Sequence, residues 1–397
     1  NIKMDIINLI LSAVILGGGF FYFASCLFAF SGHFRARRIV NDRTVNTLTV
    51  SVVIAARNEE KNIGLLLDDL LKQNYPAGRT EIVVVDDCSE DRTTEIVRSF
   101  TIKDARIRLA STRESKSPYS HKKRAVHEGI LSSGGEIIMT IDADCRVAEN
   151  WIGNVMKHFV PGIDLVAGEV IVEGGGLAGW IDTLEFSGIQ MMASGFMNAG
   201  FPLTCNGANL AYRRAAFERV GGFENIGRMV SGDDDLLMQK IAEGNSSKVV
   251  FITEKESAVY TGAVNSFGEF FARRARWASK ITSYPSKGAV ALLALFFTYF
   301  ISIPVCLALA VYGFFSFGVL AAGIGLKLAG EILLVYYGLI KIGRRKLMLL
   351  FPFAEIFHIP YMIAVNLKGF FGTFEWRGRQ AKAVSSECGD FGEKVND

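Results

Sequence analysis

The fold is decided by residues 82–89, which read Ile82-Val83-Val84-Val85-Asp86-Asp87-Cys88-Ser89. The four residues that open this stretch are apolar and favour β-structure, as expected of a parallel strand that is covered on both faces. Two adjacent acids then mark the end of the strand. Neighbouring carboxylates at a strand end are costly unless a cation or a hydrogen-bond donor meets them, so this end indicates a site.

The sequence around this stretch alternates between two patterns. Strand-like runs lie at Thr49–Ala55, Glu81–Val85, Arg106–Ser111 and Glu136–Ile141, and helix-like runs lie at Glu59–Gln73, Asp91–Phe100, Lys122–Leu131 and Trp151–Phe159. This alternation predicts an α/β domain with a mostly parallel sheet covered on both faces. In such sheets, ligands bind at the carboxyl ends of the strands. Asn58 and Ser89 are predicted to cap the two helices that follow the first strands.

Acidic residues also follow the fourth strand, in Asp142-Ala143-Asp144. Residues two apart in an extended chain point the same way, so Asp142 and Asp144 can converge on one point. Two hard oxygen ligands with open positions suit Mg²⁺ or Mn²⁺ and a substrate that carries phosphate. Further on, Asp233-Asp234-Asp235 precede a helix, where the helix dipole accounts for one or two acids. A third acid in the same place suggests that one of the three residues acts as a general base.

Residues 267–280 combine basic and aromatic side chains. The set is Phe270, Phe271 and Trp277 with Arg273, Arg274, Arg276 and Lys280. This pattern predicts a basic amphipathic helix that lies in a membrane interface. An Arg–Trp pair could also stack on a sugar or hold a diphosphate, and the two interpretations are compatible.

Several segments are apolar enough for a membrane. Residues Ile6–Phe30 carry no charge and are expected to form a retained anchor, and Arg35, Arg37 and Arg38 after it indicate that the next part of the chain is cytoplasmic. Residues Gly288–Leu326 also carry no charge, and a single helix of that length, roughly 58 Å, is too long for one crossing. Two spans are therefore predicted, with a break near 312–318.

Charged residues within these segments leave two questions open. Lys327 and Glu331 are one helical turn apart, so either they pair inside a helix bundle, or Lys327 extends to the interface while Glu331 faces water or protein. The stretch Leu347–Leu367 contains Pro352, Glu355, His358 and Pro360. Basic residues flank it on both sides: Arg344, Arg345 and Lys346 before it, and Lys368, Arg377 and Arg379 after it. It is either a span or a re-entrant or interfacial segment.

Composition supports a mixed protein. Apolar residues make up 50% of the 397 residues and charged residues 21%, which suggests a soluble domain joined to membrane segments. The balance of 43 Lys and Arg against 40 Asp and Glu excludes a broadly basic nucleic-acid binder. None of the six cysteines forms a CxxC motif, which favours free thiols.

Together, residues Val50 to Lys280 resemble a membrane-integrated family 2 glycosyltransferase with a GT-A fold, the Rossmann-like fold of nucleotide-diphospho-sugar transferases. Ala55-Ala56-Arg57-Asn58-Glu59 is similar to its opening motif, Asp86-Asp87-Cys88-Ser89 to its nucleotide-contacting D-D-x-S, and Asp142-Ala143-Asp144 to its D-x-D. Lys122 with Ala125 and Val126 is similar to the donor-side K-x-x-A-L helix. Asn206–Ala211 is similar to the segment before the acceptor site. Arg273-Arg274-Ala275-Arg276-Trp277 resembles Q-x-x-R-W, with Arg273 where Gln is expected.

The resemblance implies roles for individual residues. Asp234 is expected to be the catalytic base, with Asp233 or Asp235 as alternative registers. Metal ligation is expected from Asp142 and Asp144, with Mg²⁺ or Mn²⁺ as cofactor. Donor contacts are implied for Ala55, Arg57, Glu59, Asp86, Asp87, Lys122 and Asp142, and acceptor or diphosphate contacts for Asn209, Arg273, Arg276 and Trp277.

The implied reaction is inverting transfer from a nucleotide-diphosphate sugar, with UDP-sugars favoured, to a lipid-linked or glycan acceptor. A processive polysaccharide synthase and a catalytically inert scaffold are the alternatives. The expected parts are an anchor (1–33), a cytoplasmic GT-A domain (45–265), an interfacial helix (266–287), C-terminal membrane segments (288–368) and a cytoplasmic tail (369–397). The expected location is the bacterial cytoplasmic membrane, in contact with membrane lipids.

Overall fold

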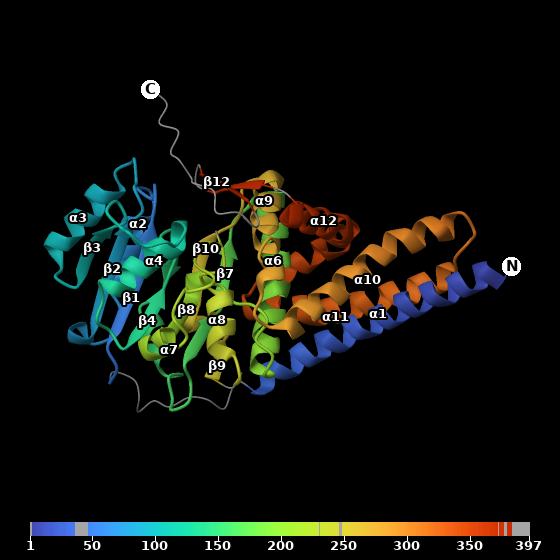
Figure 1. The fold of residues 1–397 in the computed structure, drawn as a ribbon, viewed down its shortest axis with the longest axis horizontal. Coiled ribbons are helices and arrows are strands. Elements are labelled where there is room, and N and C mark those ends of the chain that lie inside the picture. Colours follow the sequence, from blue (N-terminus) through green and yellow to red (C-terminus); the bar gives the residue numbers. More distant parts are fainter. Residues whose placement is uncertain are drawn as a thin grey trace, which may run out of the picture.

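The computed structural model describes residues 2–35, 47–229, 231–245, 248–371, 373–376 and 379–382. An α/β domain occupies one end of the molecule, and three long helices, α1, α10 and α11, run away from it side by side (Figure 1). The predicted basic residues Arg37, Arg38 and Arg377 and most of the predicted tail lie outside the described residues.

A seven-stranded sheet forms the centre of the α/β domain, in the order β3-β2-β1-β4-β8-β6-β9. Four neighbouring strands, β1 (Val50–Ala56), β2 (Thr80–Asp86), β3 (Ile107–Ser111) and β4 (Ile137–Thr140), are parallel. The remaining strands are β6 (Leu165–Gly168), β8 (Leu210–Arg213) and β9 (Val249–Ile252). Since β8 runs antiparallel to both β4 and β6, the sheet is mixed rather than wholly parallel.

Helices cover both faces of this sheet. They include α2 (Ile63–Leu71), α3 (Thr93–Lys103), α4 (His121–Leu131) and α5 (Trp151–Met156). On one face, Leu66 and Leu70 of α2 and Val97 of α3 pack with Val52 and Val84 of the strands. The predicted four strands, four helices and α/β class are confirmed, and β1, β2 and β4 are buried almost throughout, as expected of strands that are covered on both faces.

The loops after β1 and β2 are tied together. Asn58 has a positive φ of 54°, and its backbone N–H donates to Ser89 Oγ at 3.1 Å. Its Oδ1 accepts from the backbone N–H of Glu90 at 2.8 Å. The prediction that Asn58 and Ser89 cap helices is therefore wrong: α2 and α3 begin only at Ile63 and Thr93, and the two side chains join one loop to the other.

A second sheet extends the domain toward the long helices. It has three strands in the order β5 (Arg146–Val147), β10 (Val259–Gly262) and β7 (Val170–Glu173). Helix α6 (Gly176–Asn198) follows β7 and stands between the domain and the long helices (Figure 1). The remaining elements of the domain are α7 (Arg214–Arg219), α8 (Asp235–Ala242) and the short 3₁₀ turns η3 (Ala77–Arg79), η4 (Gly207–Asn209) and η6 (Lys255–Ser257).

Within the described part of the chain, four helices are long and apolar enough to cross a membrane: α1 (Ile2–Arg35), α10 (Lys287–Val311), α11 (Phe317–Lys341) and α12 (Phe351–Phe371). The predicted break near 312–318 is confirmed, because α10 ends at Val311 and α11 begins at Phe317. Helix α9 (Phe267–Ala278) and the turn η7 (Ile281–Ser283) precede α10. The turn η8 (Arg345–Leu350) lies between α11 and α12, and the hairpin of β11 (Thr373–Trp376) and β12 (Arg379–Lys382) follows α12. Large apolar side chains such as Leu9, Leu295 and Ile332 are exposed on the long helices, as expected of surfaces that face lipid.

Helix α1 makes close backbone contacts with two later helices. A Cβ at Gly19 would lie 2.6 Å from the carbonyl oxygen of Gly323 in α11, and one at Gly32 would meet the carbonyl of Gly195 in α6. Side chains larger than hydrogen do not fit at such crossings, which is the way small residues hold membrane helices together. The first helix thus joins the C-terminal helices to the α/β domain.

Candidate active site

A cavity of about 1570 Å³ lies at the carboxyl ends of β1 and β4 and continues between the long helices. Because β1, β2 and β4 are parallel neighbours, the segments that follow them meet at one edge of the sheet. Most of the predicted site residues line this cavity: Ala55, Arg57, Glu59, Asp87, Lys122, Asp142, Asp144, Asp233, Asp234, Arg273, Arg276 and Trp277.

The turn after β2 presents one acid to the cavity and hides the other. Asp87 is almost fully buried and accepts hydrogen bonds from Thr112 Oγ1 at 2.7 Å and from the guanidinium of Arg124 at 3.2 Å. Asp86 turns back to its own loop, where Oδ1 accepts from the backbone N–H of Ser89 at 3.0 Å. Asp86 is therefore absent from the cavity wall, and the structure gives it a loop-shaping position rather than the predicted donor contact.

Arg57 fixes the same loop from the other side. Its Nη1 donates to the backbone carbonyls of Asp87 at 2.9 Å and Cys88 at 3.1 Å. Glu59 is buried, and its Oε2 accepts from the side-chain amide of Asn62 at 2.9 Å. The opening motif and the acidic motif thus form one preformed wall, and a ligand that binds there needs little ordering of the protein.

Lys122 connects two acidic motifs. Its Nζ lies 2.5 Å from Asp142 Oδ1 and 3.3 Å from Asp233 Oδ2. Burial disfavours the charge on Lys122, but the carboxylates of Asp142 and Asp233 outweigh that effect and raise its pKa. The ammonium group is therefore a fixed positive charge at the end of β4.

Asp142 and Asp144 have the donor set of a magnesium or manganese site. Both line the cavity, with Asp142 half-buried and Asp144 exposed. Carboxylate oxygens are the ligands that these ions prefer, and two of them leave positions for water and phosphate. Asp142 also contacts the ammonium group of Lys122. These residues fit a divalent ion that binds together with a phosphate-bearing ligand.

The third acidic motif opens α8, and Asp234 is its N-cap. Asp234 Oδ1 accepts from the backbone N–H of Asp235 at 2.8 Å and lies 3.1 Å from Lys280 Nζ, while Oδ2 accepts from the backbone N–H of Gly207 at 3.2 Å. Burial would raise the pKa of Asp234, but Lys280 and the N–H donors outweigh it and lower the pKa below its usual range. Asp234 is therefore an ionised carboxylate on the cavity wall.

The two neighbouring acids differ in their surroundings. Asp235 is fully buried, accepts from the Tyr284 hydroxyl at 2.6 Å and lies 2.9 Å from Lys280 Nζ. Burial raises the pKa of Asp235 to about 6, with Asp234 adding to the effect. Asp235, one of the three candidates for the catalytic base, therefore does not line the cavity. Asp233 does reach it but is engaged by Lys122.

Lys280 is a site residue to which no motif assigned a role. Its ammonium group bridges Asp234 and Asp235 and lines the cavity. The available signal was composition, since Lys280 belongs to the basic and aromatic stretch 267–280, although it lies just beyond the end of α9. Arg276 itself faces Asp142, Asp233 and Asp234, whose charges oppose the lowering of its pKa by burial.

The buried arginine of α9 is Arg274, which is not among the predicted site residues. Its guanidinium donates from Nε to Glu185 Oε2 at 2.7 Å and from Nη2 to Asp182 Oδ1 at 2.9 Å. It also lies 4.4 Å from the ring centroid of Trp277. Trp277 therefore stacks on Arg274 while lining the cavity.

Two predicted acceptor-side residues take structural positions. Arg273 pairs with Asp182 at 3.3 Å, at the rim of the cavity. Asn209 is almost fully buried away from the cavity; it accepts from Trp151 Nε1 at 3.1 Å and donates to the carbonyls of Glu169 and Ser257. The prediction for Asn209 is corrected accordingly: the neighbouring Asn206, Gly207 and Ala208 approach the site instead, through the Gly207–Asp234 hydrogen bond.

The family models that match the chain agree with these motifs. Residues 51–221 match glycosyl transferase family 2, and residues 137–363, more than half of the chain, match glycosyl transferase family group 2. The glycosyltransferase AglE of Haloferax volcanii is 32% identical over 189 residues, which are 47% of this chain and 58% of AglE. The probable glycosyltransferase YdaM of Bacillus subtilis is 32% identical over 181 residues, 44% of this chain and 43% of YdaM.

A shorter match is the beta-monoglucosyldiacylglycerol synthase of Trichormus variabilis, 32% identical over 110 residues, 28% of this chain and 23% of the synthase. The chain thus matches about half or less of the length of these relatives. Among solved structures, the mannosyltransferase PcManGT of Pyrobaculum calidifontis, in complex with GDP-Man and Mn²⁺, has a TM-score of 0.60 at 21% identity, covering 90% of this chain and 98% of that one. The predicted GT-A-like fold is confirmed, and the chain belongs to the family 2 glycosyltransferases.

Proposed function

We propose that this chain transfers a sugar, with inversion at the anomeric carbon, from a nucleotide-diphosphate sugar to a lipid-linked or membrane-associated acceptor. One observation carries the proposal. The acids at the end of β4, the carboxylate of Asp234 and the membrane-type helices all line the same cavity. A donor held at the sheet edge and an acceptor that arrives from the lipid can therefore meet in it.

The donor end of the cavity supports a nucleotide diphosphate. Arg57, Glu59 and Asp87 form the rigid wall for the nucleotide, and Lys122 and Arg276 supply positive charge for the diphosphate. PcManGT binds GDP-Man, and a UDP-sugar is the donor that we expect, so both nucleotides belong in a donor panel.

A divalent ion suits the same end. Asp144, with Asp142 beside it, would hold Mg²⁺ or Mn²⁺, which neutralises the negative charge of the departing diphosphate. The Mn²⁺ in PcManGT supports this assignment by analogy of fold. Lys122 keeps Asp142 in place whether or not the ion is bound, because its ammonium already contacts Oδ1.

Asp234 is the proposed general base. Asp234 is ionised at neutral pH and lines the cavity, and its carboxylate takes the proton of an acceptor hydroxyl as the new bond to the sugar forms. The hydroxyl oxygen bonds to C1 of the sugar as the bond between C1 and the diphosphate oxygen breaks on the opposite face. The proton ends on Asp234, the nucleoside diphosphate leaves, and the configuration at C1 inverts.

The membrane setting is part of the proposal. The four long helices are candidate spans, and the family includes beta-monoglucosyldiacylglycerol synthases, whose names state a glycolipid product. We place the α/β domain on the cytoplasmic side of a bacterial cytoplasmic membrane, since Arg35 at the end of α1 follows the positive-inside tendency.

The test is nucleoside diphosphate release by the detergent-solubilised protein, with Mg²⁺ or Mn²⁺, across UDP- and GDP-sugars, with and without membrane lipid extract. Asp234→Asn is expected to lower the rate by roughly 10²–10⁴-fold. Asp144→Asn is expected to weaken the metal dependence. Asp164→Asn is the control, because Asp164 pairs with Arg219 on the surface outside the cavity.

The outcomes of this test distinguish the proposed transferase from a processive synthase and from an inert scaffold. Metal-dependent release that both cavity variants reduce and the control retains supports the proposal, and stimulation by lipid extract supports a lipid acceptor. A product with one added sugar is expected, whereas a polymer would indicate a processive synthase. Folded protein that binds no nucleotide sugar would contradict the proposal.

A further inference from the structure

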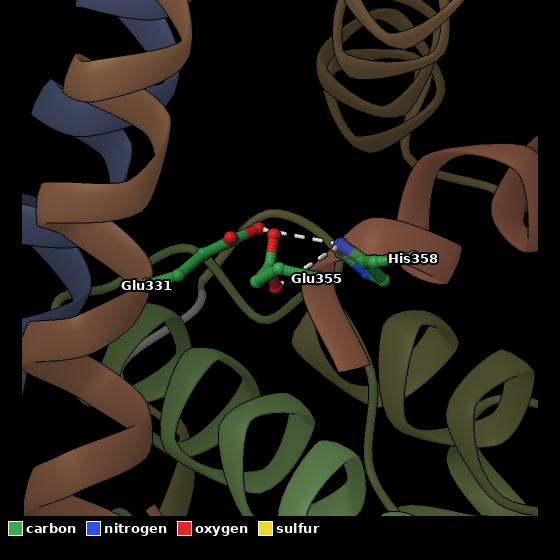
Figure 2. A group of neighbouring side chains, drawn as sticks. All are labelled: Glu331, Glu355 and His358. Carbon is green, nitrogen blue, oxygen red and sulfur yellow. Dashed lines mark ion pairs between the residues drawn. The ribbon is translucent and has the colours of Figure 1, made fainter. Parts of the chain in front are cut away.

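A second group of charged side chains lies at the other end of the cavity, among the long helices. We refer to Tyr22, Lys327, Glu331, Glu355 and His358 as the inner polar cluster. Figure 2 shows Glu331 of α11 pointing toward Glu355 and His358 of α12. Of the two interpretations of Lys327 and Glu331, the structure shows the paired one.

Lys327 is the centre of this cluster. Its Nζ lies 2.5 Å from Glu331 Oε2, 2.6 Å from Glu355 Oε2 and 3.2 Å from His358 Nδ1. The Tyr22 hydroxyl donates to the other oxygen of Glu331 at 2.8 Å. Three different helices, α1, α11 and α12, thus contribute side chains to one network.

Stability alone gives little reason for such a network. Charged groups inside membrane helices are costly, and a buried ion pair is often no more stabilising than apolar residues of similar volume. The cluster also holds two carboxylates against one ammonium. Glu331, Glu355 and His358 all line the cavity, whereas Lys327 is fully buried behind them. The oxygens that Lys327 leaves partly unused therefore face the space that a ligand can enter.

A metal ion is not the ligand that this arrangement favours. Glu331, Glu355 and His358 each offer one ligand atom within 4.8 Å of the others, which is compact enough for a cation. However, the Lys327 ammonium already contacts all three, so the positive charge that such a site requires is supplied by the protein. What remains is hydrogen-bond acceptor capacity on the carboxylates.

The two ends of the cavity differ in charge. The basic residues Arg57, Lys122, Arg276 and Lys280 line the donor end, and Arg273 and Arg274 of α9, which also line the cavity, pair with Asp182 and Glu185. Among the described residues of α1, α10, α11 and α12 that line the cavity, only His358 can carry a positive charge. Phosphate groups are therefore favoured at the donor end, and uncharged hydroxyl groups, which donate to carboxylates, at the inner end.

The size and the walls of the inner end suit a lipid. A volume of about 1570 Å³ exceeds the roughly 300–1,000 Å³ of a typical site for one small ligand, so a second substrate fits beside the donor. The rings of Phe296 and Phe300 line the same region and pack around Tyr22. An apolar chain and a polar head group can both be accommodated there.

We propose that the inner polar cluster binds the uncharged, hydroxyl-rich head group of the membrane lipid that serves as the acceptor, a sugar or a glycerol, and that the reacting hydroxyl of this head group points along the cavity toward Asp234. Glu331 and Glu355 accept hydrogen bonds from its hydroxyls, and Lys327 holds both carboxylates in position. This assignment rests on the proposed function and makes it more specific, since it selects a neutral glycolipid or acylglycerol over a lipid phosphate.

The test compares two probes that share a dodecyl chain, dodecyl β-glucoside and dodecyl phosphate. Their binding to the full chain in phosphatidylcholine nanodiscs is measured, together with binding of nucleotide sugar as a check of the donor end. Wild type is expected to bind the glucoside more tightly than the phosphate. Glu355→Gln is expected to weaken glucoside binding by about tenfold and to strengthen phosphate binding, because it removes one negative charge. Glu254→Gln, outside the cavity, is the control.

Each outcome bears on the assignment. Equal or tighter binding of dodecyl phosphate by wild type would overturn it, as would a Glu355→Gln variant that binds both probes like wild type. If Glu355→Gln no longer binds nucleotide sugar and has lost its fold, the wild-type comparison decides alone. A wild type that binds the glucoside but no nucleotide sugar would refute the proposed function instead, so the two failures are distinguishable.

Discussion

Lys280 offers the sharpest test of how the acids at the start of α8 are held. Its ammonium lies 3.1 Å from Asp234 and 2.9 Å from Asp235, and Asp235 is fully buried. Lys280→Met keeps the aliphatic stem and removes only the charge. We expect the variant to be strongly destabilised, because buried Asp235 then loses the ammonium group that lies 2.9 Å away.

The magnitude can be worked from these distances. At an effective dielectric constant of about 20, each contact contributes about 5 kcal/mol of attraction before desolvation is counted. Removing one partner of a buried pair typically costs about 3–5 kcal/mol in net stability. For a domain of this size, each kcal/mol shifts the midpoint of thermal unfolding by about 2–4 °C. The expected decrease in Tm is therefore about 10 °C.

The pH dependence identifies the carboxylate that is left alone. The pKa of Asp235 is already raised to about 6, and loss of Lys280 raises it further. A group whose pKa is higher in the folded state contributes stability at low pH that is lost as the pH rises. The destabilisation should therefore be larger at pH 8 than at pH 5.5.

Thermal unfolding of the detergent-solubilised protein at both pH values is the assay. Lys280→Arg is the control that keeps the charge, and Lys280→Met with Asp235→Asn should recover part of the loss, because it removes the uncompensated carboxylate. A Tm of Lys280→Met within about 2 °C of wild type at pH 8, or no recovery in the double variant, would refute the reasoning.

Three further predictions concern stability. Burial raises the pKa of Glu169 to about 7, so the ionisation of Glu169 lowers the stability of the protein as the pH rises from about 5 to 7. In thermal unfolding, Glu169→Gln should stabilise the protein by roughly 3 kcal/mol at pH 8 and have little effect at pH 5. An equal effect at both pH values would contradict this prediction. Gly19→Leu should cost about 1–3 kcal/mol, because its side chain meets the Gly323 backbone; Gly17→Leu, with no atom within 4 Å of its Cβ, should be tolerated in the same measurement. Arg274→Lys should lower the Tm more than Arg273→Lys does. A lysine cannot replace the guanidinium N–H groups that donate to Asp182 and Glu185, and it cannot stack on Trp277. Equal Tm values for the two variants would count against these contacts of Arg274.

The parts of the fold that the sequence predicts well are those with a repeated local signal. Runs such as Ile82–Val85 are apolar throughout because both faces of the sheet are covered, and the acids that end them meet because parallel neighbours end at the same edge. The break between α10 and α11 was predicted in the same way, from the length of one uncharged run.

The remaining features depend on contacts between distant residues. Strand β8 has only four residues, too few to reveal that it runs antiparallel. A motif gives the position of Asn209 but not the direction of its side chain, which turns to Trp151. Likewise, the pairing of Lys327 with Glu355 joins two helices, and no local period in the sequence encodes it.

The close contacts of α1 have a consequence for biogenesis. Gly19 and Gly32 meet Gly323 and Gly195, so the surface of the first helix matches partners that the ribosome makes much later. Chains emerge in order, and contacts between residues far apart in sequence form late. Until α11 exists, the surface of α1 around Gly19 lacks the backbone that it contacts in the folded protein. The packing of α1 is therefore completed only after α11 has been made.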